Sequence, residues 1–425
     1  MYPDKTPEKQ KITIVGTGNV ANVLAALLAV RNRELPENQK IEISILGREE
    51  DSRSYKTLKE NGIILNFKNS QDDGKVLRVD PQEFKIITAN PEDIKDQDHI
   101  FVTTKTYAYN LLFFQILNKL KKLSPQKGSE TTVVLAQNGI PCWFLSHTDL
   151  HKVSLKSVDP FNEMLTTIGL DNVVGCVLNL ACNSQVDEST GITSYDVYTP
   201  LKKIGIPIGK PDNSVTENIR NLKLIFNGAG IDVATRGAGI SVEVLLKLQV
   251  NIAINALTAL LDCDIGFLLD DKPLKKVVEK LAFEVSTVAS AVSSNVKMRE
   301  GQRLTDRLSM SREHITSTRE DFNKGRPLEI SIYDAVLELR SHLSQSATSV
   351  ETIVALTDIL KIATKNRDQG MTPDAARESV KKHLNSLVEY VGLSYRPETP
   401  TTAPAKGGGV NVKRLKATPQ VSVNK

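Results

Sequence analysis

The sequence predicts an α/β domain built on a parallel sheet, followed by an all-α domain and a tail. In residues 1–237, short apolar runs rich in β-branched residues alternate with helical patterns. In residues 238–395 only helical periodicity is found, and residues 396–425 are rich in Pro, Thr and Gly. A chain of 425 residues is also too long for one small core. We therefore expect a sheet domain at 1–237, a helical domain at 238–395 and a disordered tail at 396–425.

Composition excludes several classes of protein. Charged residues make up 24% of the chain and the net charge is +4, too little to indicate a nucleic-acid or membrane-surface binder. None of the four cysteines stands in a CxxC pair, which favours free thiols in a reducing compartment over disulfides or a metal site. No signal peptide is visible, and every apolar run of about 20 residues contains a charge or an amide. We expect a cytoplasmic protein without nucleic-acid, membrane or metal partners.

The first apolar run leads directly into a glycine-rich turn. Residues 11–15 read KITIV, and GTGNVA follows at 16–21 before a helical stretch. G-x-G-x-x-A between a strand and a helix is typical of a site for the pyrophosphate of a dinucleotide. Gly16 permits the tight turn, Gly18 lets the backbone approach the phosphates, and Ala21 allows close packing of helix on strand. The turn predicts a Rossmann-type domain, with cofactor contacts from Gly16, Thr17, Gly18, Asn19, Val20 and Ala21.

The end of the second predicted strand bears on the choice of cofactor. This strand spans residues 41–46 and is followed by Gly47 and Arg48. An acidic residue at this place binds the ribose hydroxyls of NAD, whereas an arginine suits the 2′-phosphate of NADP. Arg48 therefore favours NADP(H). Glu49 and Glu50 follow directly, and an ordinary surface charge is the alternative interpretation of Arg48.

The remaining strands bring further polar residues to one edge of the sheet. Lys105 and Asn138 each follow a strand end, where ligands bind in such sheets. We expect both to face the crevice near the nicotinamide, although either could be a surface residue of a loop. Further elements are predicted as strands at 62–67, 84–88, 99–103, 131–136, 173–180 and 231–234, a helix at 216–226 and a polar, insertion-like stretch at 146–162.

One helix of the second domain carries an ordered row of polar residues. Residues 241–261 are apolar nearly all the way round, as in a buried helix, apart from a row formed by Lys247, Asn251 and Asn255. Their spacing of four places them on one face, where an ammonium and two carboxamides can donate to a carbonyl oxygen or hydroxyl. Two alternatives stay open: an ion pair of Lys247 with Glu243, and asparagines that only cap a neighbouring loop.

The rest of the second domain is also predicted to be helical. Helices are expected at residues 272–297, 330–343, 350–363 and 374–390. Residues 299–326 between them are strongly charged, with many arginines. Such a stretch is typical of a phosphate-binding patch and equally of a solvated connection.

Taken together, these motifs resemble the ketopantoate reductase (2-dehydropantoate 2-reductase) family over residues 11–363. The motifs in order are GTGNVA from Gly16, KTY from Lys105, QNGIP from Gln137, KLQVNIAIN from Lys247 and HITSTREDFNKGRPLEI ending at Ile330. The resemblance implies a Rossmann-type domain followed by a helical domain like that of 6-phosphogluconate dehydrogenase. It also implies NADP(H)-dependent reduction of a 2-oxo acid, ketopantoate to pantoate in pantothenate and coenzyme A biosynthesis.

The resemblance assigns the substrate-binding residues. Lys247 would be the general acid that protonates the nascent alkoxide. Asn251 and Asn255 would hold the oxygens of the substrate, and Ser317 its carboxylate.

The resemblance also places a carboxylate beside the lysine. Glu329 would bind a substrate hydroxyl or orient Lys247, and Glu243 competes for the second role. A carboxylate near Lys247 would favour its protonated form. Asn138 and Lys105 would complete the cleft, and with Glu329 they would also contact the cofactor.

The sequence departs from the family at two places. Leu245 stands where the family often has Trp, and Thr318 stands where it has Met. We expect both residues to affect the pocket, so the prediction of the substrate is less secure than the prediction of the reaction. The alternatives are a reductase of another 2-oxo acid, an opine-type dehydrogenase, and a non-catalytic NADP-binding sensor or scaffold. A homodimer is compatible with the sequence but is not indicated by it.

Overall fold

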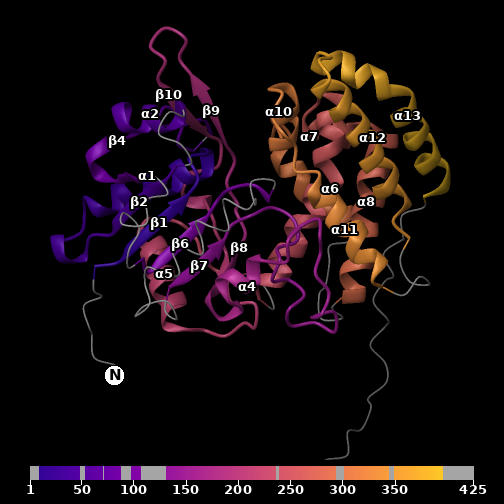
Figure 1. Ribbon diagram of the computed structural model, residues 1–425. Coiled ribbons are helices and arrows are strands. Elements are labelled where there is room, and N and C mark those ends of the chain that lie inside the picture. Colours follow the sequence, from indigo (N-terminus) through magenta and orange to yellow (C-terminus); the bar gives the residue numbers. More distant parts are fainter. Residues whose placement is uncertain are drawn as a thin grey trace, which may run out of the picture. The chain divides into compact units, whose positions relative to one another are not determined.

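The computed structural model describes residues 9–47, 53–69, 71–87, 97–106, 131–235, 239–292, 301–343 and 349–395. Within these ranges a lobe containing two sheets precedes a helical lobe (Figure 1). The predicted fold class, a Rossmann-type domain followed by an all-α domain, is therefore confirmed. Arg48, the predicted domain boundary at 237 and the predicted tail at 396–425 lie outside the described residues.

The main sheet has the order expected of a dinucleotide-binding fold. Its strands run β11-β8-β7-β6-β1-β2-β5, parallel except for β11 at one edge. The order reverses at β1, which pairs with β2 on one side and β6 on the other. In such sheets ligands bind at this reversal, beyond the carboxyl ends of the strands. The strand bounds are β1 Lys11–Val15, β2 Glu42–Leu46, β5 Lys85–Ile87, β6 His99–Val102, β7 Thr132–Leu135, β8 Val173–Cys176 and β11 Ile208–Gly209.

A second sheet, which the sequence did not predict, packs beside the first. Its order is β4-β3-β10-β9, made from β3 Ile63–Phe67, β4 Val76–Val79, β9 Cys182–Val186 and β10 Thr193–Val197. The strand predicted at 62–67 therefore belongs to this sheet and not to the main one. Buried and partly exposed residues alternate along β3, whereas β6 and β7 are buried throughout. A strand with one half-exposed face fits a small sheet, and strands buried on both faces fit a covered parallel sheet.

The strand predicted at 231–234 is wrong. The described chain makes only an isolated parallel bridge there, between Gly205 and Asp232, with backbone hydrogen bonds to Ile204 and Ile206. Ile231 and Val233 are buried, which accounts for their strand-like pattern in the sequence. The helices and 3-10 turns of this lobe are α1 Asn19–Asn32, η1 Glu37–Gln39, α2 Arg53–Asn61, η2 Pro81–Glu83, α4 Met164–Ile168, η5 Leu170–Asn172, η6 Leu201–Lys203 and α5 Glu217–Gly228.

The second lobe is organised around α6, Ile240–Leu261. This helix is long and apolar enough to cross a membrane by composition alone, but 78% of its most apolar window is buried, as in the core helix of a soluble protein. It contacts α8, α10 and α12. Three helical elements, α9, η7 and α10, lie within the charged stretch predicted at 299–326. The remaining helices are α7 Ile265–Asp270, α8 Lys272–Val292, α9 Gly301–Leu308, η7 Ser309–Ser311, α10 Ser317–Asn323, α11 Ser331–Ser341, α12 Glu351–Asp368 and α13 Pro373–Ser394.

One buried cluster extends from the main sheet into the helical lobe. It joins Val15 and Leu135 at the carboxyl ends of β1 and β7 to Ile240 and Val244 in the first turns of α6. Trp143, 1% exposed, belongs to the same cluster. The carboxyl ends of the sheet strands and the row of polar residues on α6 are therefore held against each other by a shared core.

Candidate active site

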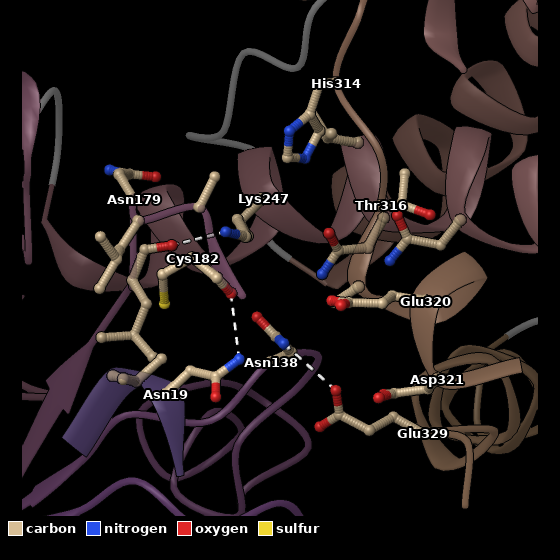
Figure 2. A pocket seen from close by; sticks show the side chains of 18 of the residues that line it. Asn19, Asn138, Asn179, Cys182, Lys247, His314, Thr316, Glu320, Asp321 and Glu329 are labelled. Atoms are coloured by element: carbon tan, nitrogen blue, oxygen red, sulfur yellow. Dashed lines mark hydrogen bonds between the residues drawn. The ribbon is translucent and has the colours of Figure 1, made fainter. Parts of the chain in front are cut away.

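A cavity of about 710 Å³ lies where the carboxyl ends of the main-sheet strands meet α6 and α10 (Figure 2). Residues from both lobes line it. Among the predicted site residues, those that line the cavity are Gly16, Thr17, Gly18, Asn19, Val20, Lys105, Asn138, Lys247, Asn251, Asn255, Ser317 and Glu329. Ala21 lies beneath the glycine-rich turn, fully buried in α1.

The glycine-rich turn has the conformation that its sequence predicts. Gly16 adopts φ +117°, and a Cβ there would come within 3.1 Å of Thr103 Oγ1 and 3.2 Å of Thr104 Cγ2. A Cβ on Gly18 would meet nothing within 4 Å. Gly18 is the N-cap of α1 and supplies no side-chain acceptor to the first turn of that helix. The turn thus presents backbone donors and open space to the cavity, which suits a pyrophosphate.

The second sheet holds this turn in place. The Asn22 amide donates to the Thr17 carbonyl at 3.0 Å and to the Tyr195 hydroxyl of β10 at 2.7 Å. Asn19 Nδ2 donates to the Cys182 carbonyl at 3.1 Å, at the start of β9 (Figure 2). Cys182 also lines the cavity. This wall was not predicted, because β9 and β10 form a hairpin of polar strands that pairs with β3 from a distant part of the chain.

Lys247 lines the cavity and is the first residue of the polar row on α6. Its Nζ donates to the Leu178 carbonyl at 2.5 Å, just beyond β8. Burial lowers the pKa of Lys247 to about 8, although the Glu329 carboxylate and the Cys176 thiol raise it. Asn251 and Asn255 line the cavity one and two turns further on. An ammonium whose pKa lies near neutrality can give up its proton readily, as a general acid must.

Of the two carboxylates considered for Lys247, Glu329 is the one that raises the lysine pKa. Burial raises the pKa of Glu329 itself, while Lys105 and the Asn138 amide lower it. Asn138 Nδ2 donates to Glu329 Oε2 at 3.3 Å (Figure 2). Glu243 is buried and also lines the cavity. Asn138 of the sheet lobe therefore binds the Glu329 carboxylate of the helical lobe.

Lys105 connects the two lobes. Its Nζ forms an ion pair with Asp321 of α10, and Arg326 Nε lies 2.8 Å from the other oxygen of the same carboxylate. The sequence predicted Lys105 in the crevice but gave no partner for it.

The start of α10 is anchored on α6. The Thr316 hydroxyl is hydrogen bonded to the Thr258 hydroxyl at 2.6 Å, and it caps α10 by accepting from the Arg319 backbone N–H. Ser317, in the first turn, is exposed toward the cavity. The hydroxyl predicted to bind a substrate carboxylate is thus positioned by its buried neighbour.

Two departures from the family do not reach the cavity. Leu245 is 1% exposed and packs in the core, and neither it nor Thr318 lines the pocket. Neither side chain therefore lines the cavity directly, and their effect on the choice of substrate stays a prediction.

Several residues of the cavity were not singled out from the sequence, among them Arg307 and His314. These two line the cavity from the segment before α10. Burial lowers the pKa of His314, and the positive charge of Lys247 lowers it further. His314 begins the motif at 314–330, but nothing in the sequence distinguished a cavity imidazole from a loop residue.

A Rossmann-type domain that opens into the same cavity as a buried lysine defines a dinucleotide-dependent oxidoreductase. Residues 12–142 match the family model described as "Ketopantoate reductase PanE/ApbA", and residues 240–361 match "Ketopantoate reductase PanE/ApbA C terminal". The two together span more than half of the 425 residues. The chain belongs to the ketopantoate reductase family.

Individual relatives agree with this assignment. The chain is 24% identical to a 2-dehydropantoate 2-reductase of Mesorhizobium japonicum, over 81% of this chain and 96% of the relative. A crystal structure of a putative ketopantoate reductase from Ralstonia solanacearum shares the fold, with a TM-score of 0.68, 21% identity and coverage of 84% and 98%. The fold is also that of a D-mandelate dehydrogenase solved with NADH and anilino(oxo)acetate, with a TM-score of 0.60, 16% identity and coverage of 88% and 100%.

Proposed function

We propose that this protein reduces a 2-oxo acid with NADPH, and that the substrate is 2-dehydropantoate, which becomes pantoate. The observation that carries the proposal is the meeting of the glycine-rich turn, Lys247 and Glu329 in one cavity. The family and the M. japonicum relative support the same substrate.

The glycine-rich turn fits the pyrophosphate of a dinucleotide. The open space at Gly18 and the uncapped start of α1 leave room and backbone donors for phosphate oxygens. When bound, the reduced nicotinamide supplies the hydride. The preference for NADP(H) over NAD(H) still rests on Arg48, which would bind the 2′-phosphate.

The residues on α6 fit the other half of the reaction. Lys247 would donate a proton to the oxygen on C2 as the carbonyl becomes an alcohol. Asn251 and Asn255 would donate to substrate oxygens, Ser317 would bind the carboxylate, and Glu329 would accept from a hydroxyl of the substrate. With a pKa of about 8, Lys247 is mostly protonated at neutral pH and can act in the direction of reduction.

Another 2-oxo acid is the second candidate substrate. The cavity also has an apolar wall, formed by Val250, Ile254, Ile265, Leu308 and Ile315. Such a wall suits the methyl groups of 2-dehydropantoate but equally a larger apolar side chain. The structural relative that acts on mandelate makes this alternative worth testing.

The test is oxidation of NADPH, followed by absorbance, with 2-dehydropantoate and with a panel of branched and aromatic 2-oxo acids. The panel is repeated with NADH. Turnover highest with 2-dehydropantoate and NADPH is expected. Highest turnover with an aromatic acid would replace the substrate, and NADPH binding without any turnover would favour a sensor or scaffold. A cytoplasmic location and a homodimer stay predictions.

A further inference from the structure

Helix α10 is too short to hold its own position. It has seven residues, and isolated helices of fewer than about 12 residues are marginal in water. Yet Ser317, Glu320 and Asp321 of this helix all line the cavity. The location of these side chains must therefore be set by what packs on the far side of α10.

Phe322 faces that far side and lies between two arginines. It is fully buried, and the guanidinium carbons of Arg367 and Arg377 each lie 5.0 Å from its ring centroid. Their side chains are only 4% and 10% exposed. A guanidinium over an aromatic face is attracted to the ring, more strongly when water is excluded. Both guanidinium groups therefore contact the ring.

The same arginines bind the carboxyl end of α10. Arg367 Nη1 donates to the carbonyls of Asp321 at 3.4 Å and Phe322 at 3.3 Å. Arg377 Nη2 donates to the Asn323 side-chain oxygen. Because the last carbonyls of a helix have no partner within it, cations placed there both satisfy and attract them.

Arg377 also ties α10 to the end of α6. Its Nε donates to the Ala259 carbonyl at 2.8 Å, and its Nη2 lies 3.4 Å from Asp262 Oδ1. The same Asp262 oxygen accepts from Arg319 Nε at 2.7 Å and from Asn323 Nδ2 at 2.9 Å. Asp262 therefore collects donors from both α10 and α13.

Helix α13, which carries Arg377, lies beyond the matched part of the family. The family model ends at residue 361, and α13 spans Pro373–Ser394. It is held by its own apolar face, which packs on α8 and α12 (yellow in Figure 1). The buried residues of this face are Ala376, Val380, Leu384, Leu387 and Val391.

We propose that α13 is a brace for the substrate side of the cavity, with Arg377 as a positioning residue that sets α10 through Phe322, Asn323 and Asp262. This inference rests on the proposed function, because Ser317 matters only if it binds a substrate. Arg377 touches no reacting group. Ala259, its contact on α6, lies 12 residues or about 18 Å along the helix from Lys247.

The test uses the full chain with Arg377→Gln, the conservative Arg377→Lys, and Lys381→Gln as a matched control. Lys381 is on the same helix but pairs with Glu378 at the surface. In Arg377→Gln we expect the KM for the 2-oxo acid to rise about tenfold, the size of one lost hydrogen bond. The KM for NADPH, whose turn lies on the other lobe, should change less than about twofold. Arg377→Lys should recover part of the effect, and Lys381→Gln should match the wild type.

Two results would overturn the inference. One is an unchanged KM for the oxo acid in Arg377→Gln, and the other is an equal rise in both KM values, which indicates general loss of structure. If Arg377→Gln does not fold, Phe322→Leu, which removes the clamped ring but keeps an apolar side chain, is measured in the same way.

A failure of the proposed function can be told apart from a failure of the brace. If the wild type turns over no 2-oxo acid, amide hydrogen exchange of Arg377→Gln is compared with that of the wild type. Faster exchange confined to α10 supports the brace without the enzyme activity. Unchanged exchange in α10 rejects it.

Discussion

At the scale of single residues, the surroundings of Lys247 set the pKa of its ammonium. The side chain is half-buried, and this loss of hydration lowers its pKa to about 8, while the Glu329 carboxylate keeps it from falling further. The regular spacing of Lys247, Asn251 and Asn255 on an apolar helix was enough to predict a polar site. The family resemblance indicated Glu329 as one partner of Lys247, whereas the Leu178 carbonyl, 69 residues away in the chain, was not predictable.

The pH dependence of reduction should follow the Lys247 ammonium. Because the protonated form is the general acid, kcat/KM for reduction should be level below about pH 8 and fall tenfold per pH unit above it. The reverse oxidation needs the neutral amine and should rise over the same range. Steady-state rates in both directions across pH 6 to 10 would measure this.

Lys247→Met is the control for that profile. It should lower kcat by about 10²-fold or more and remove the alkaline limb. A limb that survives in Lys247→Met would assign the titration to another group.

At the scale of elements, strands with an apolar or alternating pattern were predictable, the half-exposed β3 included, whereas the polar strands β9 and β10 were not. The runs that became β1, β6 and β7 read KITIV, HIFV and TVVL and are mostly apolar. Strands β9 and β10, by contrast, are polar. Their position depends on strand pairing, since β10 pairs with β3 across roughly 130 residues of chain. Helix α10 was not predicted from its own residues, because the arginines that contact it lie on α12 and α13.

Helix α12 begins on a buried carboxylate. Glu284 of α8 is fully buried and accepts from the backbone N–H groups of Thr352 at 3.1 Å and Ile353 at 2.9 Å. A negative charge at a helix N-terminus is favourable. Glu284→Ala should therefore lower the free energy of unfolding by about 3 kcal/mol, because two buried donors lose their acceptor. Urea unfolding would measure it.

The exposed Glu378→Ala serves as the comparison for Glu284→Ala. Its carboxylate pairs only with a surface lysine, so a change within about 0.5 kcal/mol is expected. Equal losses in the two variants would mean that Glu284 does not cap α12.

At the scale of the whole molecule, the two lobes share a core on one side of the cavity and an ion pair on the other. Lys105 and Asp321 meet across it, and the Asp321 side chain is 8% exposed. Lys105 was predicted to face the crevice, but its pairing with Asp321 was not, since 216 residues separate the two. The pair fixes the distance between the nucleotide side and the substrate side of the cavity.

Asp321→Asn should remove the carboxylate that Lys105 and Arg326 share, leaving Arg326 only its longer pair with Glu320 at 3.8 Å, and let the two sides of the cavity shift. Small displacements of positioned groups cost much of the rate, so kcat/KM should fall by about ten- to a hundredfold. The matched change Asp334→Asn removes an exposed pair with Lys361 inside the helical lobe and should have little effect. An unaltered kcat/KM in Asp321→Asn would show that the ion pair does not set the geometry.

The four cysteines of the chain have a practical consequence for labelling experiments. All four are free, and burial raises the pKa of Cys176, Cys182 and Cys263 to about 12 and that of Cys142 as well. At pH 7 only about one in 10⁵ thiols with that pKa is ionised to the thiolate, the form that attacks alkylating reagents. We therefore expect the native protein to react slowly with maleimide, so that a single cysteine introduced on an exposed turn of α13 would carry most of an attached fluorophore while the natural ones stay in place.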